Sequence, residues 1–137
     1  MKLARILVVD DNPINLRLIS APFAFEGYEV IMAMNAEDAQ INLADTLPDS
    51  ILMDIALPGM DGLTLTRLLK MDARTRHIRI VALTAFATKG DEQKAFDAGC
   101  DGYVTKPIDT RALPALVAGY PAVLPAAYPS GSIPSFL

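Results

Sequence analysis

The stretch ILMDIALPGMDG, residues 51–62, indicates the fold more clearly than any other part of the chain. Its first three residues are apolar, and the fourth, Asp54, is an acid followed closely by a Pro-Gly turn. Such an apolar run predicts a strand that is covered on both faces, as in a parallel sheet. Because ligands of open parallel sheets bind at the carboxyl ends of the strands, Asp54 is a candidate for the centre of a functional site.

The composition is that of an ordinary globular protein. The chain has 137 residues, of which 52% are hydrophobic and 20% charged, with a net charge of -4. This length predicts a single domain with its own core. Mild acidity argues against direct nucleic-acid binding, and no apolar stretch approaches the ~20 residues of a membrane helix. The single cysteine, Cys100, and the lack of a signal peptide predict a cytoplasmic protein.

Strand and helix patterns alternate five times along the chain. Apolar, strand-like runs occur at residues 6–9, 28–33, 50–53, 78–83 and 102–105. Helical patterns occur at residues 13–26, 36–46, 63–71, 89–98 and within 110–118. This alternation predicts the α/β class: a flavodoxin-like (βα)5 three-layer sandwich with a five-stranded parallel sheet. Right-handed crossovers favour the strand order 2-1-3-4-5, the commonest for five such units.

Prolines disturb three places in this pattern. Pro22 lies within the first helix and removes a hydrogen bond to Leu18, so we expect that helix to be bent or locally broken. Pro114 has a similar effect on the start of the last helix. Four further prolines fall within residues 120–137 and predict an extended or disordered tail. The domain should therefore span residues 1–119.

The predicted order brings polar residues together at one rim of the sheet. Strands one and three would be neighbours ~4.8 Å apart. Asp10 and Asp11, which follow strand one, would then lie beside Asp54, which follows strand three. Three carboxylates at one place repel one another unless a cation lies between them, and oxygen ligands suit Mg²⁺. Thr84 and Lys106 follow strands four and five on the same rim. These groups suit phosphoryl chemistry in which a carboxylate is the nucleophile and forms an aspartyl-phosphate.

These residues resemble the receiver (response-regulator) domain of two-component signalling, the CheY-like superfamily, together with LPGMDG at 57–62, Ala85 after Thr84 and AGCDGYVTKP at 98–107. The resemblance extends over about residues 3–118. It implies that Asp54 accepts a phosphoryl group from a histidine of a sensor kinase or a phosphotransfer protein. It also implies Mg²⁺ bound by Asp11, Asp54 and the main-chain carbonyl of Ala56, with Asp10 nearby to hold or orient the metal.

The resemblance further implies how the domain switches. Lys106 would pair with Asp54 or its phosphate, and Thr84 would bind a phosphoryl oxygen. Tyr103 would be an aromatic switch that turns inward as Thr84 moves, although a fixed, partly buried tyrosine is the alternative. Pro107 matches the family's cis-bonded proline. The output would be a changed protein-interaction face on a monomer or a weak, phosphorylation-dependent homodimer, with a downstream protein target and no membrane contact.

Other positions bear on timing and partners. The resemblance implies that Ala56 and Phe86 flank the path by which water would reach the phosphate, at positions that influence autodephosphorylation in the family. Neither side chain can position water by hydrogen bonding. We therefore expect slow-to-moderate hydrolysis of the phosphoryl group. Pro22 lies in the helix that receivers commonly use to meet their kinase, so it bears on partner geometry.

Alternatives to a phosphorylated single-domain receiver stay open. One is a magnesium-dependent phosphatase or phosphotransferase, although such enzymes usually place the nucleophile after strand one and carry a cap for which this chain has no room. Another is a receiver that acts only as an unphosphorylated interaction scaffold. A third is a fragment of a larger regulator or hybrid kinase. We expect no classical enzyme, at most self-phosphorylation from small donors and autodephosphorylation.

Overall fold

The computed structural model describes residues 4–84, 89–105, 113–114 and 117. Within these residues, five parallel strands form one sheet in the order β2-β1-β3-β4-β5, which confirms the predicted topology. The strands are β1 (Arg5–Val9), β2 (Glu29–Ala33), β3 (Ser50–Asp54), β4 (Arg79–Thr84) and β5 (Gly102–Thr105). The helices are α1 (Pro13–Phe25), α2 (Ala36–Asp45), α3 (Gly62–Met71) and α4 (Lys89–Ala98).

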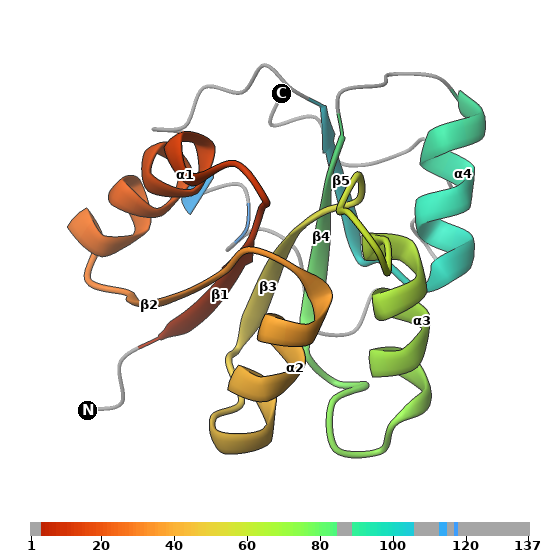
Figure 1. The fold of residues 1–137 in the computed structure, drawn as a ribbon, viewed down its shortest axis with the longest axis horizontal. Helices are drawn as coiled ribbons and strands as arrows, with labels where there is room; N and C mark the ends of the chain where they lie inside the picture. Colours follow the sequence, from red (N-terminus) through yellow and green to blue (C-terminus); the bar gives the residue numbers. More distant parts are fainter. Residues whose placement is uncertain (1–3, 85–88, 106–112, 115–116, 118–137) are drawn as a thin grey trace.

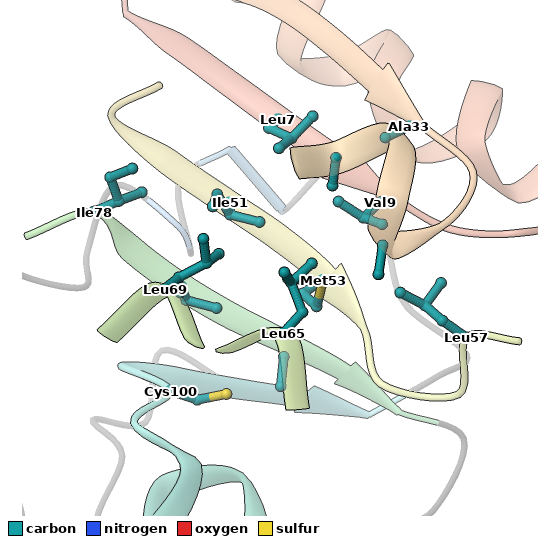
Figure 2. Close-up of a cluster of buried hydrophobic side chains, with 14 of the residues drawn as sticks. Leu7, Val9, Ala33, Ile51, Met53, Leu57, Leu65, Leu69, Ile78 and Cys100 are labelled. Carbon is teal, nitrogen blue, oxygen red and sulfur yellow. The ribbon is translucent and has the colours of Figure 1, made fainter. Parts of the chain in front are cut away.

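Helices cover both faces of the sheet, as Figure 1 shows. Alternate strand residues point to opposite faces, so each face has its own apolar cluster. Leu7 and Val9 of β1 belong to the cluster beneath α2, α3 and α4, while Ile6 and Val8 belong to the cluster beneath α1. Figure 2 shows part of the first cluster, in which side chains of β1, β3 and α3 converge. Burial on both faces explains the nearly unbroken apolar strands in the sequence.

The strand register brings the ends of three strands to one rim. Val9 of β1 is paired with Met53 of β3, so the residues after them lie side by side. Asp54 is in turn paired with Leu83, the residue before Thr84. Polar residues that are far apart in the sequence thereby meet at the carboxyl edge of the sheet.

Helix α1 begins as predicted but does not break. The Asn12 side chain accepts hydrogen bonds from the backbone N–H groups of Ile14 and Asn15 at 2.9 and 3.2 Å, which caps the first turn. The helix then runs through Pro22 as one element, so of the two predicted outcomes the local break is wrong and the bend stays a prediction. Pro22 lies in the last turn and deprives only the Leu18 carbonyl of a partner.

The other element bounds agree with the sequence to within one or two residues. Helix α3 begins at Gly62 rather than Leu63, and β3 and β4 include Asp54 and Thr84 themselves. The last predicted helix, within residues 110–118, and the tail at 120–137 lie almost wholly outside the described residues. Among the helices that are described, none combines the length and apolarity needed to cross a membrane.

A partly buried ion pair joins α3 to the opposite, amino edge of the sheet. The Lys70 ammonium donates to the Asp101 carboxylate at 2.9 Å and to the carbonyls of Ile78 and Arg76 at 2.8 and 3.2 Å. The same Asp101 oxygen accepts from the Ile80 N–H at 2.9 Å. Burial raises the pKa of Asp101, and hydrogen bonds from Lys70 and Ile80 oppose that rise. This network fixes the loop between α4 and β5 against the start of β4.

Candidate functional site

Three carboxylates meet at the carboxyl rim of the sheet. One oxygen from each of Asp10, Asp11 and Asp54 lies within 4.8 Å of the others. Asp10 and Asp54 are 0% and 4% exposed, whereas Asp11 is open to solvent. Carboxylates this close repel one another, and oxygen-only donors are what a hard divalent cation such as Mg²⁺ prefers. The cluster predicted from the sequence is therefore present and open on one side.

Backbone N–H groups orient the two buried acids. The Asn12 N–H donates to Asp10 Oδ1 at 2.9 Å, and the Ala56 N–H donates to Asp54 Oδ1 at 2.9 Å. Hydrogen bonds to an ionised carboxylate are stronger than neutral ones, so they hold the acids in place. The structure thus places Ala56, the predicted source of a ligating carbonyl, directly beside Asp54.

The loop between β3 and α3 is anchored at both ends. Leu57 is buried in the cluster beneath α2, α3 and α4, next to the end of β3 (Figure 2). Asp61 caps α3 by accepting a hydrogen bond from the Thr64 N–H at 2.8 Å. The Gly62 N–H donates to the Ile55 carbonyl at 3.2 Å, which closes the loop on itself. The residues around Asp54 are therefore fixed by packing as well as by hydrogen bonds.

Thr84 and Tyr103 lie on neighbouring strands and are joined by a side-chain hydrogen bond. Both are buried. Burial raises the pKa of the Tyr103 hydroxyl, and the acids Asp91 and Glu92 of α4 raise it further. Tyr103 is therefore a buried neighbour of Thr84 in this structure. That it turns inward only on phosphorylation stays a prediction.

Some predicted site residues lie outside the described part of the chain. These are Lys106, the expected ammonium at the rim, Pro107, and Phe86 beside the expected path of water. Sequence reasoning also overlooked one residue that the structure places against the site, Gly62. Its only signal was its position directly after Asp61 in the Asp-Gly turn.

Comparison with known proteins shows which family this chain belongs to. The response regulator receiver domain matches residues 6–118, nearly all of the chain that carries the sheet and the acidic rim. The chain belongs to the response regulator receiver family. Receiver domains are signalling domains of two-component systems, and they interact with histidine kinases and with downstream targets.

Two relatives illustrate how far the sequence similarity of this receiver extends. Response regulator PleD of Caulobacter vibrioides is 48% identical over 106 residues, which are 77% of this chain but only 23% of PleD. The polar-differentiation response regulator DivK of Brucella anthropi is 43% identical over 103 residues, 75% of this chain and 84% of DivK.

A solved structure extends the comparison to three dimensions. It is the receiver domain of sensor histidine kinase PA1611 from Pseudomonas aeruginosa PAO1, with a TM-score of 0.78 and 33% identity. The match covers 87% of this chain and 98% of that one. The PA1611 structure is described with a magnesium ion coordinated in its active-site cleft. The chain spans about a quarter of PleD, most of DivK and nearly all of the solved PA1611 receiver domain.

Proposed function

We propose that this receiver carries a phosphoryl group on Asp54, taken from a phosphohistidine of a sensor kinase or a phosphotransfer protein. A carboxylate oxygen of Asp54 attacks phosphorus, the phosphorus–nitrogen bond breaks, and the electron pair leaves with the imidazole, which takes up a proton. The observation that carries this proposal is the buried Asp54 carboxylate at the strand end, oriented by the Ala56 N–H. Two further acids lie beside it.

The donor set suits Mg²⁺. Asp11 and Asp54 would bind the ion with the main-chain carbonyl of Ala56, and Asp10 would hold or orient it. Once bound, the ion offsets the charge of the carboxylates and of the incoming phosphoryl group. The magnesium described in the PA1611 receiver supports this assignment. Asp11, the exposed member of the cluster, leaves the site accessible from solvent.

Thr84 and Lys106 complete the proposed site. Thr84 is the last residue of β4 and lies on the same rim, so its hydroxyl would donate to a phosphoryl oxygen. The Lys106 ammonium would offset the negative charge of the phosphoryl group. Because Thr84 is hydrogen-bonded to Tyr103, its movement toward a phosphoryl group changes the partner of a buried tyrosine on β5. The added charge on Asp54 would thereby change the surface around α4 and β5, which a downstream protein reads.

Intact-mass measurement tests the phosphoacceptor. After incubation with Mg²⁺ and acetyl phosphate, we expect the wild-type chain to gain the mass of one phosphoryl group and Asp54→Ala to gain none. Asp45→Ala, which removes an exposed acid at the end of α2, serves as the control and should label like the wild type. An unlabelled wild type would indicate a scaffold, and continuous release of phosphate from a separate substrate would indicate an enzyme. Either result contradicts the proposal.

The outer face of α1 supports the proposed protein partner. Ile14, Leu18 and Phe25 are exposed, Phe25 by 88%, and their spacing places them on one stripe of the helix. The helix begins two residues after Asp11, so this stripe starts beside the acidic rim. Contiguous exposed apolar surface often marks an interaction site. We therefore place the docking surface of the histidine-bearing partner on this stripe.

Exchanging stripe residues tests this docking surface. We expect Leu18→Ser with Phe25→Ser to slow phosphoryl transfer from a histidine kinase by about tenfold, the equivalent of ~1.4 kcal/mol of lost contact. Labelling by acetyl phosphate should not change, because that donor needs no docking surface. The kinases of the source organism, each assayed at short times, are the donors. Equal transfer rates for wild type and variant from every active kinase would place the surface elsewhere.

A further inference from the structure

Gly62, the first residue of α3, lies directly against the backbone of the strand that ends in Asp54. A Cβ atom at this position would be 2.5 Å from the Asp54 carbonyl oxygen and 2.7 Å from Ile55 Cα. It would also be 3.0 Å from Met53 Cγ. The first two atoms belong to the backbone and cannot move without moving the end of β3. The first turn of α3 therefore comes closer to Asp54 than any residue with a side chain allows.

Space, and not backbone conformation, is the reason for a glycine here. Gly62 is helical and does not have a positive φ. At an ordinary helix position alanine is favoured over glycine. Hydrogen bonds hold Gly62 on both sides: its N–H donates to the Ile55 carbonyl at 3.2 Å, and its carbonyl accepts from Thr66 Oγ1 at 2.8 Å. The close approach is thus built into the structure.

This contact closes the loop that surrounds the acidic rim. The chain leaves β3 at Asp54 and returns to the same peptide at Gly62. Ala56, whose N–H orients the Asp54 carboxylate, lies within the loop. Met53 and Leu65 pack together on the core side of the contact (Figure 2). The position of α3 therefore sets the position of the loop relative to Asp54.

We propose that Gly62 is a positioning residue of the phosphoacceptor site. Its contact with the peptide between Asp54 and Ile55 sets where the Asp54 carboxylate and the Ala56 carbonyl lie, and so sets the affinity for Mg²⁺. This inference rests on the proposed function, which assigns both groups to the metal. An alanine at position 62 must open the contact from 2.5 Å toward the ordinary 3.4 Å. Functional groups need to be held within about 0.5 Å, so this displacement is large enough to matter.

The test compares Gly62→Ala with Gly99→Ala. Gly99 has φ +108, and a Cβ there would meet the Lys70 side chain at 2.8 Å, so its replacement also strains the fold. It precedes β5 and lies at the other edge of the sheet. We expect Gly62→Ala to raise the Kd for Mg²⁺, measured by isothermal titration calorimetry, on the order of tenfold. Gly99→Ala should leave that Kd within about twofold. The amide resonance of Ala56 should shift in the first variant alone.

A second pair of variants decides the matter if Gly62→Ala does not fold. Thr66→Val removes the hydroxyl that holds the Gly62 carbonyl, and Thr75→Val removes an equivalent buried bond to the Leu69 carbonyl, 2.7 Å long, at the far end of α3. We expect only Thr66→Val to weaken Mg²⁺ binding, by about threefold. Unchanged Mg²⁺ affinity in a folded Gly62→Ala, or in Thr66→Val, overturns the role of Gly62. A wild type that binds no Mg²⁺ overturns the proposed function instead.

Discussion

Replacing Lys70 with methionine should lower the free energy of unfolding by about 1–3 kcal/mol, between the cost of breaking an exposed ion pair and that of breaking a fully buried one. The side chains of Lys70 and Asp101 are only 18% and 11% exposed. Methionine keeps much of the packing but leaves the Asp101 charge buried without its ammonium partner. Urea unfolding followed by circular dichroism measures the change.

Two further variants separate the charge from other effects. Arg5→Ala removes an ion pair with Glu29 that is 2.6 Å long but exposed, and it should cost no more than about 1 kcal/mol. Adding Asp101→Asn to Lys70→Met should recover most of the loss, because a neutral amide still accepts from the Ile80 N–H. A Lys70→Met variant as stable as the wild type would show that the pair contributes little to the fold.

The pH dependence of the Lys70→Met variant depends on Asp101. Burial raises the pKa of Asp101, so the folded chain binds this proton more tightly than the unfolded chain. The tighter binding of this proton in the folded chain stabilises the fold. This stabilisation is complete at pH values below the pKa of Asp101 in the unfolded chain, and it is lost as the pH rises through the pKa of Asp101 in the folded chain. Removing Lys70 raises the native pKa further. The stability gap between variant and wild type should therefore narrow as pH falls from 7 toward ~4; a constant gap would contradict this expectation.

Asp11→Ala should change stability in opposite directions with and without Mg²⁺. Without the ion, removal of one carboxylate relieves repulsion in a cluster whose oxygens lie within 4.8 Å, so the variant should unfold at a higher temperature than the wild type. With Mg²⁺ at one hundred times its wild-type Kd, the wild type should gain about 2.7 kcal/mol. Without the Asp11 carboxylate, Mg²⁺ should bind at least tenfold more weakly. The same Mg²⁺ concentration should then raise the free energy of unfolding of the variant by about 1.4 kcal/mol or less.

Thermal unfolding over a series of Mg²⁺ concentrations measures both effects. Asp45→Ala is the matched control, because it removes an exposed acid outside the cluster and should keep the full gain from Mg²⁺. An Asp11→Ala variant that responds to Mg²⁺ like the wild type would remove Asp11 from the proposed ligands. Calcium at the same concentrations would show whether the gain is specific to the smaller ion.

Much of the fold could be predicted because short-range patterns of residue types indicate the individual strands, helices and turns. Apolar runs at 6–9 and 51–53 are typical of strands covered on both faces, and Asn12 before Pro13 indicates the start of a helix. The acidic cluster could be predicted from topology, since adjacent parallel strands end at the same rim. The element bounds were accurate to one or two residues because turns and caps are encoded by short-range residue preferences.

Other features could not be predicted because they depend on contacts between distant segments. No sequence pattern indicates that Lys70 pairs with Asp101, 31 residues away, since both types are usually exposed. A rule for helix interiors predicted a bent or locally broken helix at Pro22, yet α1 continues as one helix in whose last turn the proline lies. The burial of Tyr103 near Thr84 likewise depends on the pairing of β4 with β5.

Asp54 and its neighbours show where local and tertiary information divide. Residue order alone indicates that an acid ends a buried strand, that two more acids end another, and that a Pro-Gly turn comes next. How firmly Asp54 is held depends on two contacts of the folded chain. The Ala56 N–H donates to the Asp54 carboxylate, and Gly62 packs against the backbone of Asp54 itself. The physical reason is that residue types and short-range periodicity determine which elements form, whereas the closest approach of two backbones is set by packing across the whole core.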